Sequence, residues 1–200
     1  MATPVGHYLL GLTVTQLFAT SRDEPRKGLW LATIAWVPDL DVVPGILAGN
    51  LARFHHGASH SVVAAAVFAL VAFGTLRQRG WKAPESVALL LFWLYCSHVV
   101  LDFFTLDPGA PHGVPLFWPW GETYQSPWAL LPNVQHTSGP LFSAHNLFLM
   151  VREAVVFLPL VGFVDALNRA RWRSLPAAAW FFGIWFFAAA SASFLSLQGR

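Results

Sequence analysis

The sequence predicts an all-α, polytopic membrane protein, with about six transmembrane or membrane-embedded helices in a single domain over residues 1–200. The composition, the apolar segments and the basic loops between them lead to this fold class. Hydrophobic residues make up 56% of the chain and charged residues only 11%, whereas soluble domains carry about 25% charged residues. Ten Trp and seventeen Phe residues agree with this class, because aromatic side chains gather at membrane interfaces.

Six apolar segments are the candidate helices: residues 5–20, 29–47, 62–76, 86–105, 147–167 and 176–197. Spanning a membrane takes about 20 mostly apolar residues. The first and third segments are short, and the second is interrupted at Pro38 and at Pro44-Gly45. Short or broken segments at membrane depth are tolerated where they line a cavity enclosed by protein. We therefore expect these segments to line such a cavity.

Nine of the twelve Lys and Arg residues lie in three loops, at residues 21–28, 77–85 and 168–175. The positive-inside rule places these loops in the cytoplasm and both termini on the other side. The eight histidines then all lie at the non-cytoplasmic end. The sequence pI is about 9.0, but no single helix or tail is basic, so a nucleic-acid partner is not expected.

The connection at residues 106–146 lies on the same side as the histidines and is rich in Pro, Gly and Trp, for example in the run Pro-Leu-Phe-Trp-Pro-Trp at 115–120. Long connections without secondary structure are usually functional or disordered. The aromatic content argues against disorder. We expect an interfacial lid over a site.

Three histidines, His55, His56 and His60, fall within six residues just before the third apolar segment. Histidine is the commonest metal ligand, and imidazole suits zinc, copper, iron and nickel. The neighbouring Ser59 and Ser61 lack the Gly-x-Ser-x-Gly context of a nucleophile. We interpret them as helix caps or as donors behind the ligands.

A second pair, His98 and Asp102, shares one face of a predicted helix because the two residues are four positions apart. The alternative is a hydrogen-bonded pair that locks two helices together. An ionisable residue at the centre of a membrane helix costs about 2.5–3.5 kcal/mol on insertion scales. Several such residues need a shared compensating charge, which a divalent cation supplies.

The acids Asp39 and Asp41 follow Pro38, which favours an interrupted helix whose side chains face a cavity. A solvated acidic helix end is the alternative, and histidines at the same depth favour metal ligation. His7 and His112 are candidate site residues only because the other histidines and acids are expected at the same end of the helices. His136 and His145 are interpreted as bystanders, and Glu122 and Glu153 stand in no motif.

The ordered series Gly6-His7, Pro38-Asp39-x-Asp41, His55-x-Gly57-x-Ser59-His60-Ser61, His98-x-x-x-Asp102 and 113–119 (Gly-Val-Pro-Leu-Phe-Trp-Pro) resembles the YdjM-type membrane-bound metal-dependent hydrolases. The resemblance covers residues 6–119. The family usually has His-Arg-Gly-x-Thr-His-Ser where this chain has His56 for Arg and Ser59 for Thr. The family pattern points to His55 and His60 as ligands, whereas helical spacing favours His56 and His60, so this choice stays open.

The family is distantly similar to zinc-dependent phospholipase C, which implies phosphoester chemistry with a metal-activated water. The expected metal ligands are His7, Asp39, Asp41, His55, His60, His98 and Asp102, and Asp39 or Asp41 is the expected catalytic base. Arg53, His56 and His112 are the candidate substrate contacts. The resemblance implies one to three divalent ions, zinc in the first place and Mn²⁺ as the alternative, in a bacterial inner (plasma) membrane protein. The expected partners are the lipid bilayer and a phospholipid or lipid-linked phosphate.

Two other hypotheses stay open from the sequence. Intramembrane His and Asp also mark ion pathways, so the chain could be a metal-ion transporter, although the cytoplasmic half is apolar apart from Asp165. The second hypothesis is a metal-stabilised membrane scaffold or regulator without turnover. A structural zinc site is closed, whereas a catalytic site keeps a position open for water. The excess of donors favours catalysis.

Overall fold

The computed structural model describes residues 1–18, 25–49, 55–107, 112–134, 143–170 and 177–198. In chain order the elements are α1 (Pro4–Leu17), α2 (Pro25–Ala32), the 3-10 turns η1 (Thr33–Trp36) and η2 (Pro38–Asp41), α3 (Val42–Leu47), the 3-10 turn η4 (Ala58–His60), α4 (Val62–Gln78), α5 (Pro84–Phe103), α6 (Ala144–Ala170) and α7 (Ala177–Gln198). Within these residues there are only helices and two isolated β-bridges, one of which joins Thr105 to Leu131. The all-helical prediction is confirmed.

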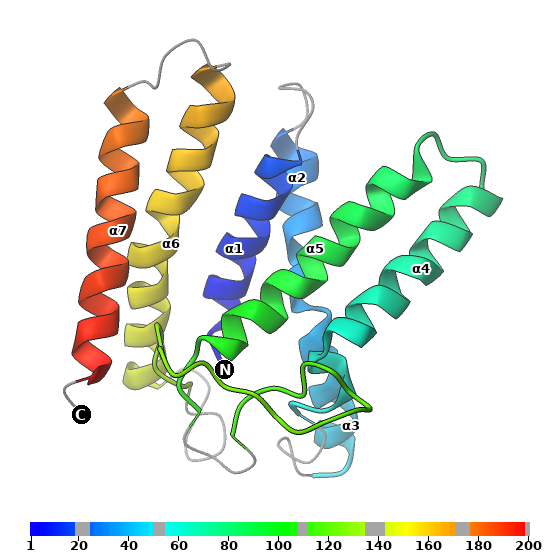
Figure 1. Ribbon diagram of the computed structural model, residues 1–200, viewed down its shortest axis with the longest axis horizontal. Helices are drawn as coiled ribbons and strands as arrows, with labels where there is room; N and C mark the ends of the chain where they lie inside the picture. Colours follow the sequence, from blue (N-terminus) through cyan, green and yellow to red (C-terminus); the bar gives the residue numbers. More distant parts are fainter. Residues whose placement is uncertain (19–24, 50–54, 108–111, 135–142, 171–176, 199–200) are drawn as a thin grey trace.

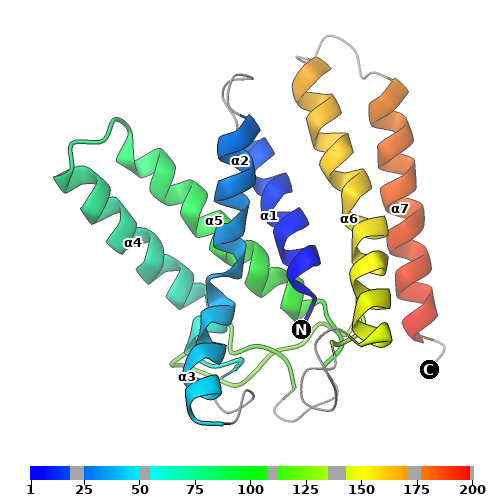
Figure 2. The ribbon, with the colours of Figure 1, turned by 180° about the vertical axis from the view of Figure 1, so that it is seen from behind.

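Helix α1 lies at the centre of the bundle, between the pair α4–α5 and the pair α6–α7 (Figure 1). It contacts α2, α5 and α6, and α2 is seen in front of it when the molecule is viewed from behind (Figure 2). The start of α2, the turn between α4 and α5 and the end of α6 lie at the upper end of Figure 1, and they include the described parts of the predicted basic loops, residues 25–28, 77–85 and 168–170. Both termini, α3 and residues 112–134 lie at the lower end. In its described part, the chain therefore places the segments that border its basic loops and its histidine-bearing turns at opposite ends of the bundle.

Among the described residues, three helices are long and apolar enough to cross a membrane, namely α5, α6 and α7. The segments Lys27–Trp36 and Pro38–Leu47 add a fourth span if they are counted as one, bent by 43°. Helix α4 has 17 residues and α1 has 14, so both are shorter than a full span. The structure supports three or four spans by length and composition, and the count of about six stays a prediction.

The predicted interruption of the second segment occurs at Pro38. Turn η1 ends at Trp36 and η2 begins at Pro38. In a 3-10 turn the N–H of residue 38 would bond to the carbonyl of Ala35, and proline has no N–H. The break therefore leaves the Ala35 carbonyl available to another segment and turns the acids of η2 toward the bundle.

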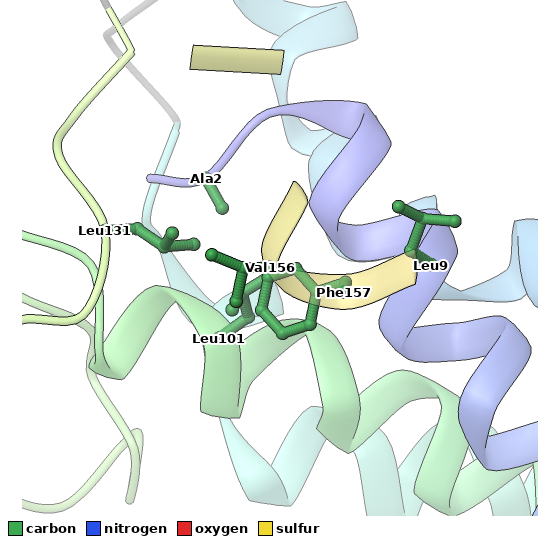
Figure 3. Close-up of a cluster of buried hydrophobic side chains, with 6 residues drawn as sticks. All are labelled: Ala2, Leu9, Leu101, Leu131, Val156 and Phe157. Carbon is green, nitrogen blue, oxygen red and sulfur yellow. The ribbon is translucent and has the colours of Figure 1, made fainter. Parts of the chain in front are cut away.

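Two apolar clusters fix the lower end of the bundle. Figure 3 shows the first, in which Leu9 of α1, Leu101 of α5 and Val156 of α6 gather with Leu131 of the long connection. The second joins α4 and α5 to Val114 of the same connection. Leu131 and Val114 are both fully buried. Burying such a side chain contributes about 1.5–3 kcal/mol, so these residues anchor the predicted lid.

Backbone hydrogen bonds tie this connection to the end of α5. The Ser126 N–H donates to the Phe103 carbonyl at 2.9 Å, and the Leu130 N–H donates to the Phe104 carbonyl at 2.7 Å. Its large aromatic side chains point outward, and Trp120 and Trp128 are 71% and 67% exposed. In its described part, the predicted lid is an ordered segment with an aromatic outer surface.

Candidate metal centre

The seven predicted ligands come together from four segments of the chain, and His56 joins them. Each belongs to at least one group of three side chains whose ligand atoms lie within 4.8 Å of one another. The groups are His55, His56 and His60; His7, Asp39 and His98; His60, His98 and Asp102; and Asp39, Asp41 and His55. Helix α1, turn η2, the turn before α4 and helix α5 meet here. This cluster could hold a metal ion.

Five distances among four of these atoms are close to those between ligands of one tetrahedral metal ion. His98 Nε2 lies 3.1 Å from His60 Nε2, 3.1 Å from Asp102 Oδ2 and 3.4 Å from Asp39 Oδ1. His60 Nε2 lies 3.5 Å from Asp39 Oδ1 and 3.6 Å from Asp102 Oδ2. A tetrahedron with metal–ligand bonds of about 2.0–2.1 Å has edges of about 3.3–3.4 Å. Five of the six distances among the four atoms, at 3.1–3.6 Å, are therefore close to this length. We call His60, His98, Asp39 and Asp102 the tetrahedral set.

Several of the same side chains have buried polar atoms without a hydrogen-bond partner. They are both ring nitrogens of His7, Asp39 Oδ1, His56 Nε2 and Asp102 Oδ2. Nearly all buried polar atoms in folded proteins are paired, and an unpaired one costs free energy because it has lost its contact with water. A cation bound among these side chains would give such atoms the partner that they lack.

Helix α5 brings His98 and Asp102 to the cluster on one face, as their spacing predicts, and both side chains are buried. His98 Nδ1 lies 2.7 Å from the Ala35 carbonyl. Because a carbonyl only accepts, Nδ1 carries the hydrogen and Nε2 presents a lone pair to the cluster. A ligating histidine is commonly oriented in this way by its second nitrogen. The gap in the hydrogen bonds at Pro38 thus sets the tautomer of His98.

Asp41 lies behind two of the imidazoles. Its Oδ1 is 2.8 Å from His55 Nδ1, and its Oδ2 is 3.1 Å from His60 Nδ1. Ser59 also donates from its hydroxyl to Oδ2, at 2.7 Å. Both oxygens of Asp41 are therefore engaged by protein donors, which is typical of a carboxylate that orients ligating histidines.

His60 lies outside the membrane-spanning segments, in η4. Burial by itself lowers its pKa, but the nearby carboxylates of Asp39 and Asp41 outweigh burial and raise the pKa to about 9. At neutral pH and without metal, His60 is therefore protonated and paired with acids. A metal ion must displace this proton before it can bind at Nε2.

A family model described as YdjM inner membrane protein matches residues 1–196. The chain belongs to this family. The match extends over the last third of the chain, beyond the motifs at residues 6–119, and it agrees with the apolar helices in placing the chain in a membrane. Neither a protein with a curated description nor a solved structure matches the chain significantly.

In this member of the YdjM family the rings of both His55 and His56 reach the cluster, so neither residue excludes the other as a ligand. His56 Nε2 lies 4.0 Å from Asp102 Oδ2 and its Nδ1 lies 3.6 Å from Asp107 Oδ2. Burial lowers the pKa of His56, so the ring is neutral at pH 7. His55 Nε2 lies 2.6 Å from Met1 Sδ. His56 is thus closer to Asp102 of α5 and to Asp107 just beyond that helix, and His55 is closer to the start of the chain.

The two other candidate substrate contacts are not in the described cluster. His112 is exposed, and its Nδ1 lies 3.0 Å from the Asp107 carbonyl. Arg53 lies outside the described residues, as does His136. His145, interpreted as a bystander, is exposed on α6. The roles of Arg53 and His112 stay predictions.

His7 of helix α1 is held against the cluster by Glu153 of α6, a residue that the sequence analysis placed in no motif. The His7 ring stacks on His98, with centroids 3.7 Å apart. Buried Glu153 of α6 accepts hydrogen bonds from the Thr3 N–H at 2.8 Å, the Gly6 N–H at 2.9 Å and the Thr3 hydroxyl. A Cβ on Gly6 would lie 2.5 Å from Glu153 Oε2, so this contact needs glycine.

One sequence feature could have revealed Glu153. It is an acid inside the apolar segment 147–167, and an ionisable residue within a membrane segment implies a nearby partner. The partner in this case is the backbone at the start of α1, which no residue pattern indicates.

We expect metal affinity to rise with pH between about 6.5 and 9. The pKa of His60 is raised to about 9, so each pH unit below that value costs about tenfold in affinity for the one displaced proton. Above about 9 the affinity should level off. Competition with a chromophoric chelator from pH 6.5 to 9.5 measures this slope. A flat profile would contradict the proposed contact between metal and His60.

Proposed function

We propose that this chain is a membrane-bound metal-dependent hydrolase that cleaves phosphoester bonds in an amphiphilic substrate. The observation that supports it best is the tetrahedral set of His60, His98, Asp39 and Asp102 together with further unpaired donors on His7 and His56. A closed structural zinc site uses four ligands. Donors beyond four favour a site that binds a second ion or keeps a position for water.

The four tetrahedral atoms would hold the first ion, and the donor set of nitrogen and oxygen favours zinc, with Mn²⁺ as the alternative. His7, His56 and the second oxygen of Asp102 would serve another. A bound ion of this kind supplies a water with a pKa of about 7 and positive charge beside the phosphoryl oxygens.

Two acids take different roles in this proposal. Both oxygens of Asp41 already accept hydrogen bonds from His55, His60 and Ser59, so we assign Asp41 to holding these rings in place. The Asp39 side chain is 20% exposed, whereas those of His60 and Asp102 are fully buried. With Oδ1 of Asp39 in the tetrahedral set, its second oxygen is therefore the carboxylate oxygen best placed to take a proton from the attacking water.

The proposed orientation has the metal centre on the non-cytoplasmic side of the inner membrane. The described residues of the basic loops, 25–28, 77–85 and 168–170, lie at the opposite end of the bundle (Figure 1), and the positive-inside rule would assign that end to the cytoplasm. The site would then receive a phospholipid or lipid-linked phosphate from the outer leaflet.

The test is hydrolysis by purified protein loaded with Zn²⁺ or Mn²⁺, with aryl phosphomonoesters, aryl phosphodiesters and short-chain phospholipids as substrates. We expect wild type to cleave at least one class and His98→Ala to lose both metal and activity. His145→Ala, which changes an exposed histidine on α6, is the matched control and should retain both. Tight metal binding with no cleavage of any ester would favour the scaffold hypothesis instead.

A further inference from the structure

An apolar groove of about 390 Å³ lies beside the metal centre. Its walls come from α4, α5, the turn before α4 and the lid. The residues that line it include Val37, Ala58, Val63, Val67, Phe68 and Trp118. The volume lies within the range of small-molecule pockets, about 300–1,000 Å³.

The groove and the metal centre share two pieces of backbone. Ala58 and Ser59 line the groove and directly precede the ligand His60 in the same 3-10 turn. Val37 lines it two residues before Asp39. A molecule in the groove is therefore adjacent to the cluster, so one ligand could occupy both.

The two hydroxyl groups that border the groove are already paired. The Ser59 hydroxyl donates to Asp41 Oδ2, and the Tyr95 hydroxyl donates to the Ser59 carbonyl at 2.7 Å. A peptide placed here would leave its own N–H and C=O groups without partners, at a cost in free energy. A hydrocarbon chain has no such groups, so the chemistry of the groove favours a chain over a peptide.

The α4 wall continues onto an exposed apolar face. Val67, Leu70 and Val71 are 55%, 68% and 64% exposed, which a soluble surface rarely shows as a patch. Trp118, 48% exposed, borders the groove from the lid, and Trp is enriched where hydrocarbon meets the polar head groups. This arrangement leaves a side entrance for a chain from the lipid phase.

We propose that this groove binds a hydrocarbon chain of the phosphoester whose head group lies at the metal centre. This inference rests on the proposed function and specifies its substrate: a phosphoester with a long alkyl or acyl chain. The apolar walls hold the chain by burial, and the shared turn at Ala58–His60 sets the chain and the phosphate at a fixed separation.

The test uses dodecyl phosphate with a photoreactive diazirine at the chain end and zinc-loaded protein in lipid nanodiscs. We expect crosslinks on the α4 peptide that carries Val63 and Val67. Excess dodecyl phosphate should compete for this site, and ethyl phosphate should not. Val67→Trp, which fills the groove, should lower the crosslinking by about tenfold. Leu70→Trp, which introduces the same side chain on the exposed face of α4 outside the groove, should leave it unchanged.

Metal content, measured on both variants, should equal that of wild type, because neither residue belongs to the groups that could hold a metal. Equal crosslinking in Val67→Trp and wild type would overturn the proposal. Equal crosslinking by a dodecyl alcohol probe would also overturn it, since the groove would then hold bilayer lipid without regard to the phosphate.

Crosslinking requires no turnover, so the proposed chain binding in the groove and the proposed hydrolase activity can be refuted independently. Head-group-dependent labelling without cleavage of any ester would support the groove and refute the hydrolase. The opposite result is also possible, in which the protein cleaves the ester and KM depends on chain length in the same way in Val67→Trp and in wild type. This result would refute chain binding in the groove but not the hydrolase activity.

Discussion

Replacing Asp102 by Asn is expected to weaken metal binding by more than about 100-fold and to abolish any hydrolysis. Even residues behind the ligands change metal affinity by about 10–100-fold, and Asp102 Oδ2 is itself a vertex of the tetrahedral set, 3.1 Å from His98 Nε2. Asn keeps an oxygen for the Ala2 N–H, which Asp102 Oδ1 accepts at 2.9 Å. The variant therefore removes the negative charge with little change in shape. Metal analysis after dialysis, together with the phosphoesterase assay, measures both effects.

The matched control is Asp165→Asn, the same change in α6. Asp165 lies near the end of that helix and belongs to none of the groups that could hold a metal. Its variant should keep the metal content of wild type. If Asp102→Asn retained as much metal as Asp165→Asn, the tetrahedral set would be wrong.

Replacing Glu153 by Ala is expected to lower the free energy of unfolding by about 2–6 kcal/mol, because two buried N–H donors lose their acceptor at about 1–3 kcal/mol each. These donors belong to Thr3 and Gly6, at the start of the helix that carries His7. We therefore also expect a looser His7 and weaker metal binding. Thermal unfolding in one detergent, followed with and without metal, separates the two effects.

Glu122→Ala is the control for this prediction, because Glu122 is exposed in the long connection. Its unfolding temperature should match that of wild type, as is usual for surface substitutions. Glu153→Gln keeps the side-chain length and one acceptor oxygen, so its unfolding temperature should lie between those of Glu153→Ala and Glu122→Ala. An unfolding temperature unchanged in Glu153→Ala would show that the hydrogen bonds at the start of α1 do not hold this helix.

The acids and histidines in apolar segments could be predicted as a group from the sequence, because each is costly alone at membrane depth. The helical spacing of His98 and Asp102 placed them on one face, and Pro38 predicted the break that turns Asp39 inward. These inferences succeed because spacing and proline geometry act within a few residues of the chain.

The sequence could not predict which ring atom faces the cluster. That depends on partners far along the chain, such as the Ala35 carbonyl, which lies 63 residues from His98. The same holds for Asp41, which lies behind His55 and His60. The family pattern offered His55 and helical spacing offered His56, and the turn at residues 55–60 brings both rings to His60.

By itself, then, the sequence determined that this is a helical membrane protein and which side chains have to share a charge. Hydropathy and local geometry are sufficient for both conclusions. Only the tertiary structure decided how those side chains divide between contacting a metal and orienting its ligands, and that Glu153 fastens α1 beside them. The physical reason is that hydrogen-bond acceptors are supplied by whichever segment packs nearby, and packing joins residues that are 60 to 150 positions apart.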